Sequence, residues 1–126
     1  MNKKYSLYFI STLAIIFIGV FFFTKHEQKE IAQDSSSIIF FYGDSCPHCK
    51  NVEKYFQEND MRNRISFEEK EVYKNANNAK ILNEKAKKCD IKENEIGVPL
   101  LWAYGKCYMG DEEIIKFFNE KIDEKQ

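Results

Sequence analysis

Two cysteines stand three positions apart in the segment Cys46-Pro47-His48-Cys49. On the first turn of a helix, residues with this spacing lie on one face, where their sulfurs can form a disulfide. Proline suits the first position of a helix, so Pro47 places Cys46 at the N-cap. There the Cys46 sulfur lies over unpaired backbone N–H groups at the positive end of the helix dipole, which stabilises a thiolate.

The same spacing gives the two cysteines different roles. Cys49 shares a helical repeat with Val52 and Phe56, so we expect its sulfur to be shielded among apolar side chains. Cys46 is then the nucleophile and Cys49 the residue that resolves the mixed disulfide. His48, and to a smaller degree Lys50, adds positive charge beside Cys46. A stabilised thiolate favours the reduced form, so the disulfide should be an oxidant.

Other uses of the pair remain open at this point. The two cysteines could form a purely structural disulfide or half of a zinc site, or they could carry a soft metal ion together with His48. A zinc site normally needs a second close pair of ligands, whereas Cys89 and Cys107 stand far apart along the chain. We therefore favour redox chemistry and expect no resident metal and no cofactor.

Cys89 and Cys107 allow two interpretations of equal weight. Cys89 completes the apolar face of an expected helix, so both residues could be small buried hydrophobic side chains. Alternatively they form a structural disulfide that joins this helix to a hairpin, which would stabilise the fold by about 3 kcal/mol in the chain-entropy model.

Hydrophobic periodicity predicts the elements that position these residues. The expected elements are a buried strand over 38–42, a helix over 46–58, a strand at 65–67 continuing toward 72, a helix over 79–89, a hairpin of strands 99–103 and 106–109, and a final helix from 111. Asp111 is expected to cap that final helix. The order βαβαββα predicts an α/β fold with a four-stranded mixed sheet and three flanking helices.

The N-terminal region has a different character. Residues 5–24 contain no charge, and about 20 helical residues span the roughly 30 Å of a bilayer core. A cleaved signal peptide is the alternative, but the stretch ends in Val20-Phe21-Phe22-Phe23, without small residues for cleavage. We therefore divide the chain into a basic N-terminus (1–4), a transmembrane signal-anchor (5–24), a polar linker (25–37) and a folded domain (38–126).

Composition and cysteine usage indicate the surroundings of the domain. A net charge of −1 argues against nucleic acid as a partner, because no basic excess is present to neutralise phosphates. The cysteines favour an environment where disulfides persist, so we expect a single-pass protein with a cytoplasmic N-terminus and the domain in the periplasm or at the cell exterior. We expect a monomer.

The segment from Ile38 to Cys49 and onward resembles the thioredoxin superfamily in a glutaredoxin-sized layout. The motifs that carry the resemblance are the CPHC segment after a buried strand, Val98-Pro99 before the third strand, and Gly110-Asp111 at the start of the last helix. The resemblance covers about 85 residues. The pair Pro47-His48 between the cysteines is similar to the Dsb oxidases of the bacterial cell envelope, although the chain has no room for their helical insertion.

The resemblance implies a thioredoxin-like fold in which Pro99 follows a cis bond beside the cysteines and Val98 offers its backbone to a substrate strand. It implies an oxidase or isomerase of exported cysteine-containing proteins that is reset by a membrane or soluble redox partner. A reductant, for example for haem-attachment cysteines, is the alternative. Thioredoxins carry a buried carboxylate where this chain has Phe40. Proton removal from Cys49 would then use water, Glu71 or His48.

Overall fold

The computed structural model describes residues 37–124, which contain one four-stranded sheet in the order β2-β1-β3-β4. Its strands are β1 (Ile38–Tyr42), β2 (Glu68–Glu71), β3 (Leu100–Ala103) and β4 (Lys106–Met109). β1 pairs parallel with β2 and antiparallel with β3, and β3 pairs antiparallel with β4. The mixed sheet expected from the order of elements is therefore confirmed.

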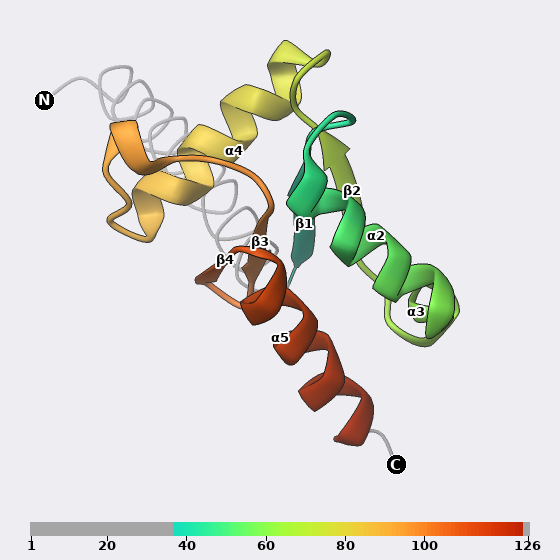
Figure 1. The fold of residues 1–126 in the computed structure, drawn as a ribbon. Helices are drawn as coiled ribbons and strands as arrows, with labels where there is room; N and C mark the ends of the chain where they lie inside the picture. Colours follow the sequence, from blue (N-terminus) through green and yellow to red (C-terminus); the bar gives the residue numbers. More distant parts are fainter. Residues whose placement is uncertain (1–36, 125–126) are drawn as a thin grey trace, which may run out of the picture. The chain divides into compact units, whose positions relative to one another are not determined.

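Helices cover both faces of this sheet. α2 (Pro47–Glu58) and α5 (Asp111–Asp123) pack together on one face, where Figure 1 shows them side by side. α4 (Ala76–Lys88) packs on the opposite face. These are the three expected helices, and the structure adds a short helix, α3 (Met61–Arg64), and a 3₁₀ turn at Glu93–Glu95.

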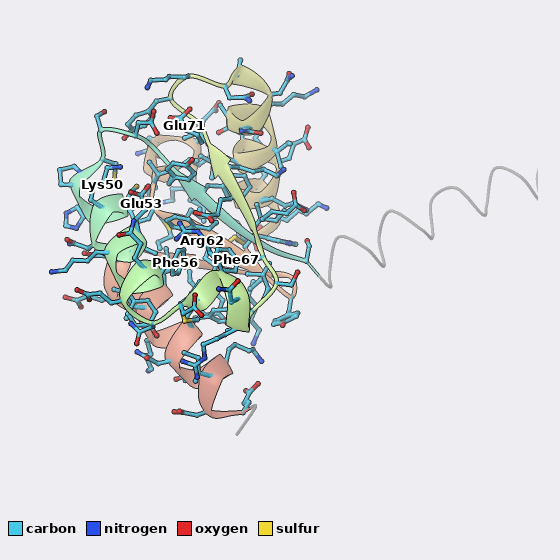
Figure 2. The ribbon with its side chains drawn as sticks, turned by 90° about the vertical axis from the view of Figure 1, so that its right-hand side faces the viewer. Lys50, Glu53, Phe56, Arg62, Phe67 and Glu71 are labelled. Atoms are coloured by element: carbon cyan, nitrogen blue, oxygen red, sulfur yellow. A yellow bond between two sulfur atoms is a disulfide. The ribbon has the colours of Figure 1, made fainter. Side chains whose placement is uncertain are left out.

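The alternation of side chains along β1 divides the core into two layers. Ile38 and Phe40 face α2 and α5, whereas Ile39 and Phe41 face α4. On the α2 side, Phe56 is the centre of an aromatic cluster, and the centroid of its ring lies 4.9 Å from that of Phe67. Figure 2 labels both residues. Because both faces of β1 are buried, its continuous apolar run is the pattern of a central strand.

Two details differ from the expectations. The second strand was expected at 65–67 with a continuation toward 72, but only the continuation is a strand, at Glu68–Glu71. It is an edge strand made only of charged residues. Ile65 and Phe67 instead pack against the α2 side of the core from the segment before the strand. Asp111 also does not cap α5 with its side chain, because Gly110 occupies the N-cap position and Asp111 is the first helical residue.

The predicted anchor (5–24) and all of the predicted linker (25–37) except Ser37 lie outside the described residues. Within residues 37–124, none of the helices has the length and apolar character needed to span a bilayer.

Candidate active site

Cys46 is the N-cap of α2, and Pro47 is the first residue of the helix. The Cys46 Sγ accepts a hydrogen bond from the backbone N–H of Cys49, with 3.3 Å between the two atoms. The sulfur thus takes the place that a serine or aspartate oxygen holds at an ordinary N-cap. A thiolate at this atom would be stabilised by that N–H and by the helix dipole.

The two free sulfurs differ in their surroundings. Cys46 keeps 7% of its surface exposed, whereas Cys49 is fully buried with Val52 and Phe56. Burial, followed by the hydrogen bond with Cys46, raises the pKa of Cys49 to about 12, although a hydrogen bond from the Gly43 backbone acts in the opposite direction. Of the two cysteines, only Cys46 has surface that an incoming disulfide can reach.

The loop before β3 lies beside the reactive sulfur. The peptide bond between Val98 and Pro99 is cis, as the resemblance implied. The Cys46 Sγ lies 3.6 Å from the Val98 carbonyl oxygen, which accepts a hydrogen bond from the thiol. A disulfide has no S–H to donate, so this contact stabilises only the thiol form of Cys46.

His48 lies at the junction of α2 and α5. Its Nδ1 is 3.2 Å from Asp111 Oδ1, and the second carboxylate oxygen accepts a 2.6 Å hydrogen bond from Asn51 Nδ2. The Asn51 bond is the largest of the influences that lower the pKa of Asp111, and the His48 bond adds to it. Asp111 therefore holds the histidine side chain, of which 70% remains exposed, at the edge of the cysteine motif.

Glu71 was one candidate for taking the proton of Cys49, but its carboxylate has another role. It accepts hydrogen bonds from the backbone N–H groups of Asp44, Tyr73 and Lys74. Partial desolvation opposes them, but these three bonds together lower the pKa of Glu71, which makes it a weaker base. Figure 2 shows Glu71 at the end of β2, where it organises the loop that follows the strand.

Lys50 does not add its charge to the sulfur in the simple way expected. Its Nζ forms a 2.8 Å ion pair with Glu53 one turn further along α2, and Figure 2 shows both side chains on this helix. Because this pair largely neutralises itself, Lys50 has less charge to offer the Cys46 sulfur.

Cys89 and Cys107 form a disulfide with a Cα–Cα distance of 6.1 Å. It joins the C-cap of α4 to the edge strand β4. Of the two interpretations that the sequence left open, the structure therefore confirms the structural disulfide. This disulfide belongs to the scaffold, because it lies with the core layer on the α4 side of the sheet.

Sequence reasoning missed three residues around the motif. Asn51 and Asp111 fix the position of α2 relative to α5, and the Gly110-Asp111 pair offered a signal that was assigned to helix capping instead. Tyr73 lies against Gly43, within 2.3 Å of where a Cβ would stand there, and nothing in its own sequence neighbourhood indicates this contact.

Among residues 37–124, no three histidine, cysteine, aspartate or glutamate side chains form a group that could hold a metal ion.

Comparisons with known proteins show likeness at the level of structure alone. No protein-family model matches the chain, and no curated protein matches its sequence. Buckwheat glutaredoxin in complex with glutathione is 14% identical, with a TM-score of 0.49 over 76% of this chain and 80% of that one. Wheat glutaredoxin is 23% identical (TM-score 0.48, 77% and 82%), and oxidised glutaredoxin 2 from Chlamydomonas reinhardtii is 18% identical (0.49, 80% and 86%).

Proposed function

We propose that this protein is a thiol–disulfide oxidoreductase that uses Cys46 and Cys49 to oxidise or isomerise disulfides in exported proteins. The observation that carries the proposal is the N-cap position of Cys46. Its sulfur accepts a hydrogen bond from the backbone N–H of Cys49 at the start of α2, while Cys49 itself is fully buried. The start of the helix thus favours negative charge on the Cys46 sulfur, whereas burial favours the protonated form of Cys49.

The exchange balances without any cofactor. In the oxidising direction, a thiolate of the client protein attacks Cys46 of the Cys46–Cys49 disulfide, and Cys49 leaves and takes up a proton. A second client thiolate then attacks the client sulfur of the mixed disulfide, which releases Cys46 as a thiolate. The client gains one disulfide, and the chain becomes a dithiol that a second disulfide, in a membrane or soluble redox partner, oxidises again.

Two contacts favour an oxidant over a reductant. The Val98 carbonyl accepts the Cys46 S–H, and Asp111 holds His48 next to the motif. Each stabilises one protonation state of the reduced chain, since the Val98 carbonyl accepts from the thiol and a protonated His48 favours the thiolate. A disulfide gains neither, because it has no S–H and no charge. A pair whose reduced form is stabilised has a less negative reduction potential.

We propose a single-pass membrane protein whose domain 38–126 lies outside the cytoplasm. The uncharged stretch 5–24 supports an anchor, and two lysines precede it. The Cys89–Cys107 disulfide supports an oxidising compartment, because such bonds are rare where glutathione and thioredoxin keep thiols reduced.

The reduction potential of the full chain in detergent tests the direction of exchange. Equilibration with glutathione buffers, read by alkylation of Cys46, should give a value less negative than about −200 mV, within the range between glutaredoxins and strong oxidants. A value below about −250 mV, close to that of thioredoxin, would favour the reductant instead. A Cys49→Ser variant should accumulate mixed disulfides through Cys46, and a failure to do so would remove the proposed roles.

A further inference from the structure

Tyr73 is a large side chain beside the cysteine motif that neither the proposed chemistry nor the core uses. Its surface is 57% exposed, which makes it the most exposed large hydrophobic side chain among the described residues. Its ring lies directly against Gly43, the residue that follows β1, where a Cβ would come within 2.3 to 2.6 Å of three ring atoms. Only a glycine leaves room for the ring in this position.

Gly43 connects this ring to both cysteines. The Gly43 carbonyl accepts the backbone N–H of Cys46, and its backbone hydrogen-bonds the Cys49 thiol. Partial desolvation raises the pKa of the Tyr73 phenol, and the nearby sulfurs of Cys46 and Cys49 raise it further. The ring is therefore close enough to the two sulfurs to respond to their charge.

The loop that carries Tyr73 is held in place by charged contacts. Glu71 accepts the backbone N–H groups of Tyr73 and Lys74 at 2.8 Å each, and Lys74 forms a 2.5 Å ion pair with Asp44. Asn75 then caps α4 with its side chain. A tyrosine that is exposed on a loop tied down this firmly loses little further conformational entropy when a ligand covers it.

The topology places three contact points in a row at one end of the sheet. Tyr73 follows β2, Gly43 and Cys46 follow β1, and Val98 precedes β3, which runs antiparallel to β1. Neighbouring strands are about 4.8 Å apart and an extended chain advances about 3.3 Å per residue. A polypeptide whose cysteine lies over Cys46 would thus bring a side chain about one or two residues away onto Tyr73.

We infer that Tyr73 is a specificity-determining residue that packs against an apolar or aromatic side chain close to the reacting cysteine of a client polypeptide. This inference rests on the proposed function and names its substrate class as extended protein segments rather than small thiols. Cys46 itself exposes little surface, so most of the contact area beside the sulfur must come from neighbours such as Tyr73.

The test uses the oxidised full chain in detergent and short peptide dithiols that differ at one position. Phenylalanine or serine stands one or two residues from one cysteine, on either side, and dithiothreitol serves as the small dithiol. Rates are measured by acid quench, alkylation and mass spectrometry. The wild type should prefer the best phenylalanine peptide over its serine counterpart by about tenfold, the effect of roughly 1.4 kcal/mol of aromatic contact.

Four variants and one control variant make the test specific. Tyr73→Ala should reduce this preference to about twofold or less, and Tyr73→Phe should keep it, because the ring makes the contact. Gly43→Ala should act like Tyr73→Ala, since its Cβ displaces the ring without straining a backbone that is not left-handed. The double variant Gly43→Ala/Tyr73→Ala should lose no more of the peptide preference than either single variant. Tyr104→Ala is the matched control, since Tyr104 is also an exposed tyrosine (48%) but lies at the opposite end of β1. There its backbone N–H donates to the Ser37 carbonyl.

Each alternative result contradicts the inference in a recognisable way. An unchanged peptide preference in Tyr73→Ala would show that the ring does not contact the client. Equal slowing of both peptides and dithiothreitol would mean that Tyr73 acts on the cysteines, which overturns the specificity role but leaves the proposed function standing. A wild-type chain that exchanges with none of these dithiols would remove the proposed function, and this inference with it.

Discussion

His48 Nδ1 lies 3.2 Å from Asp111 Oδ1, so the histidine between the two cysteines is tied to a helix that begins 63 residues further along the chain. A nearby carboxylate favours the charged form of an imidazole, and a charged imidazole favours a neighbouring thiolate. The negative charge of Asp111 would by itself disfavour a nearby thiolate. Its favourable influence on Cys46 must therefore act through His48.

Replacing His48 should make the disulfide harder to reduce. We expect His48→Ala to move the reduction potential by roughly 30–60 mV in the negative direction, because a Cys46 thiolate loses the positive charge that a protonated His48 provides. Equilibration with glutathione buffers measures the shift. An unchanged potential would show that the helix N-terminus alone sets the properties of the pair.

Asp111→Asn should produce about half of that effect, a shift of roughly 15–30 mV in the negative direction, because the amide keeps a hydrogen-bond acceptor but loses the charge. Asn51→Ala is the matched control, since it removes the other hydrogen bond to Asp111 and leaves the carboxylate beside His48. In a His48→Ala background the Asp111→Asn shift should vanish or change sign. The same negative shift in that background would contradict a role through His48.

The stability of the reduced protein should fall at alkaline pH because of Cys49. Its pKa rises from an ordinary 9.0 to about 12 in the folded state. Below pH 9 the folded and unfolded chains both keep this proton, whereas between pH 9 and 12 only the folded chain does. Unfolding then releases a proton, so the free energy of unfolding decreases by about 1.4 kcal/mol per pH unit in this range.

Denaturant unfolding at pH 8.5 and 10.5, with a reductant that leaves Cys89–Cys107 oxidised, measures this decrease. Cys49→Ala is the control, since it retains every other titrating group and lacks this one. The stability difference between the two proteins should therefore change with pH. Parallel pH profiles for both proteins would mean that the Cys49 thiol ionises in the folded state as readily as in the unfolded one.

Removing the second disulfide should weaken the fold without touching the cysteine motif. We expect the double variant Cys89→Ala/Cys107→Ala to lose about 3 kcal/mol of unfolding free energy, because the unfolded chain regains the freedom of a closed loop. Replacing both residues avoids leaving a reactive free thiol. Urea unfolding of the full chain in detergent measures the loss, and a variant as stable as the wild type would show that packing alone joins α4 to β4.

Local sequence was sufficient for the parts of this protein whose physics is local. Proline at the first helical position and the three-residue cysteine spacing placed Cys46 at the N-cap, and the helical repeat placed Cys49 with Val52 and Phe56 in the core. The continuous apolar run of β1 identified the central strand, because both of its faces are covered. These features depend on neighbours within a few positions of each other.

The edge strand β2 shows where such reasoning stops. Glu68–Glu71 has no apolar alternation, since its side chains face solvent or the rim of the core, and charges protect an edge from pairing with other chains. What makes it a strand is its parallel pairing with β1, from Ile39 opposite Glu68 to Tyr42 opposite Glu71. Ile65 and Phe67, just before the strand, show the alternation typical of a strand although they pack against the core from a loop.

The contacts that distinguish this site were decided only by the tertiary structure. His48 meets Asp111, Tyr73 covers Gly43, and Cys89 bonds to Cys107, each across a separation that no helical or strand periodicity encodes. Residue type and periodicity determined the chemistry of each residue and its place on a helix, strand or loop. The packing of α2 against α5, and the meeting of loops at one end of the sheet, determined which of them became partners, because side chains remote in sequence interact only once the core fixes their positions.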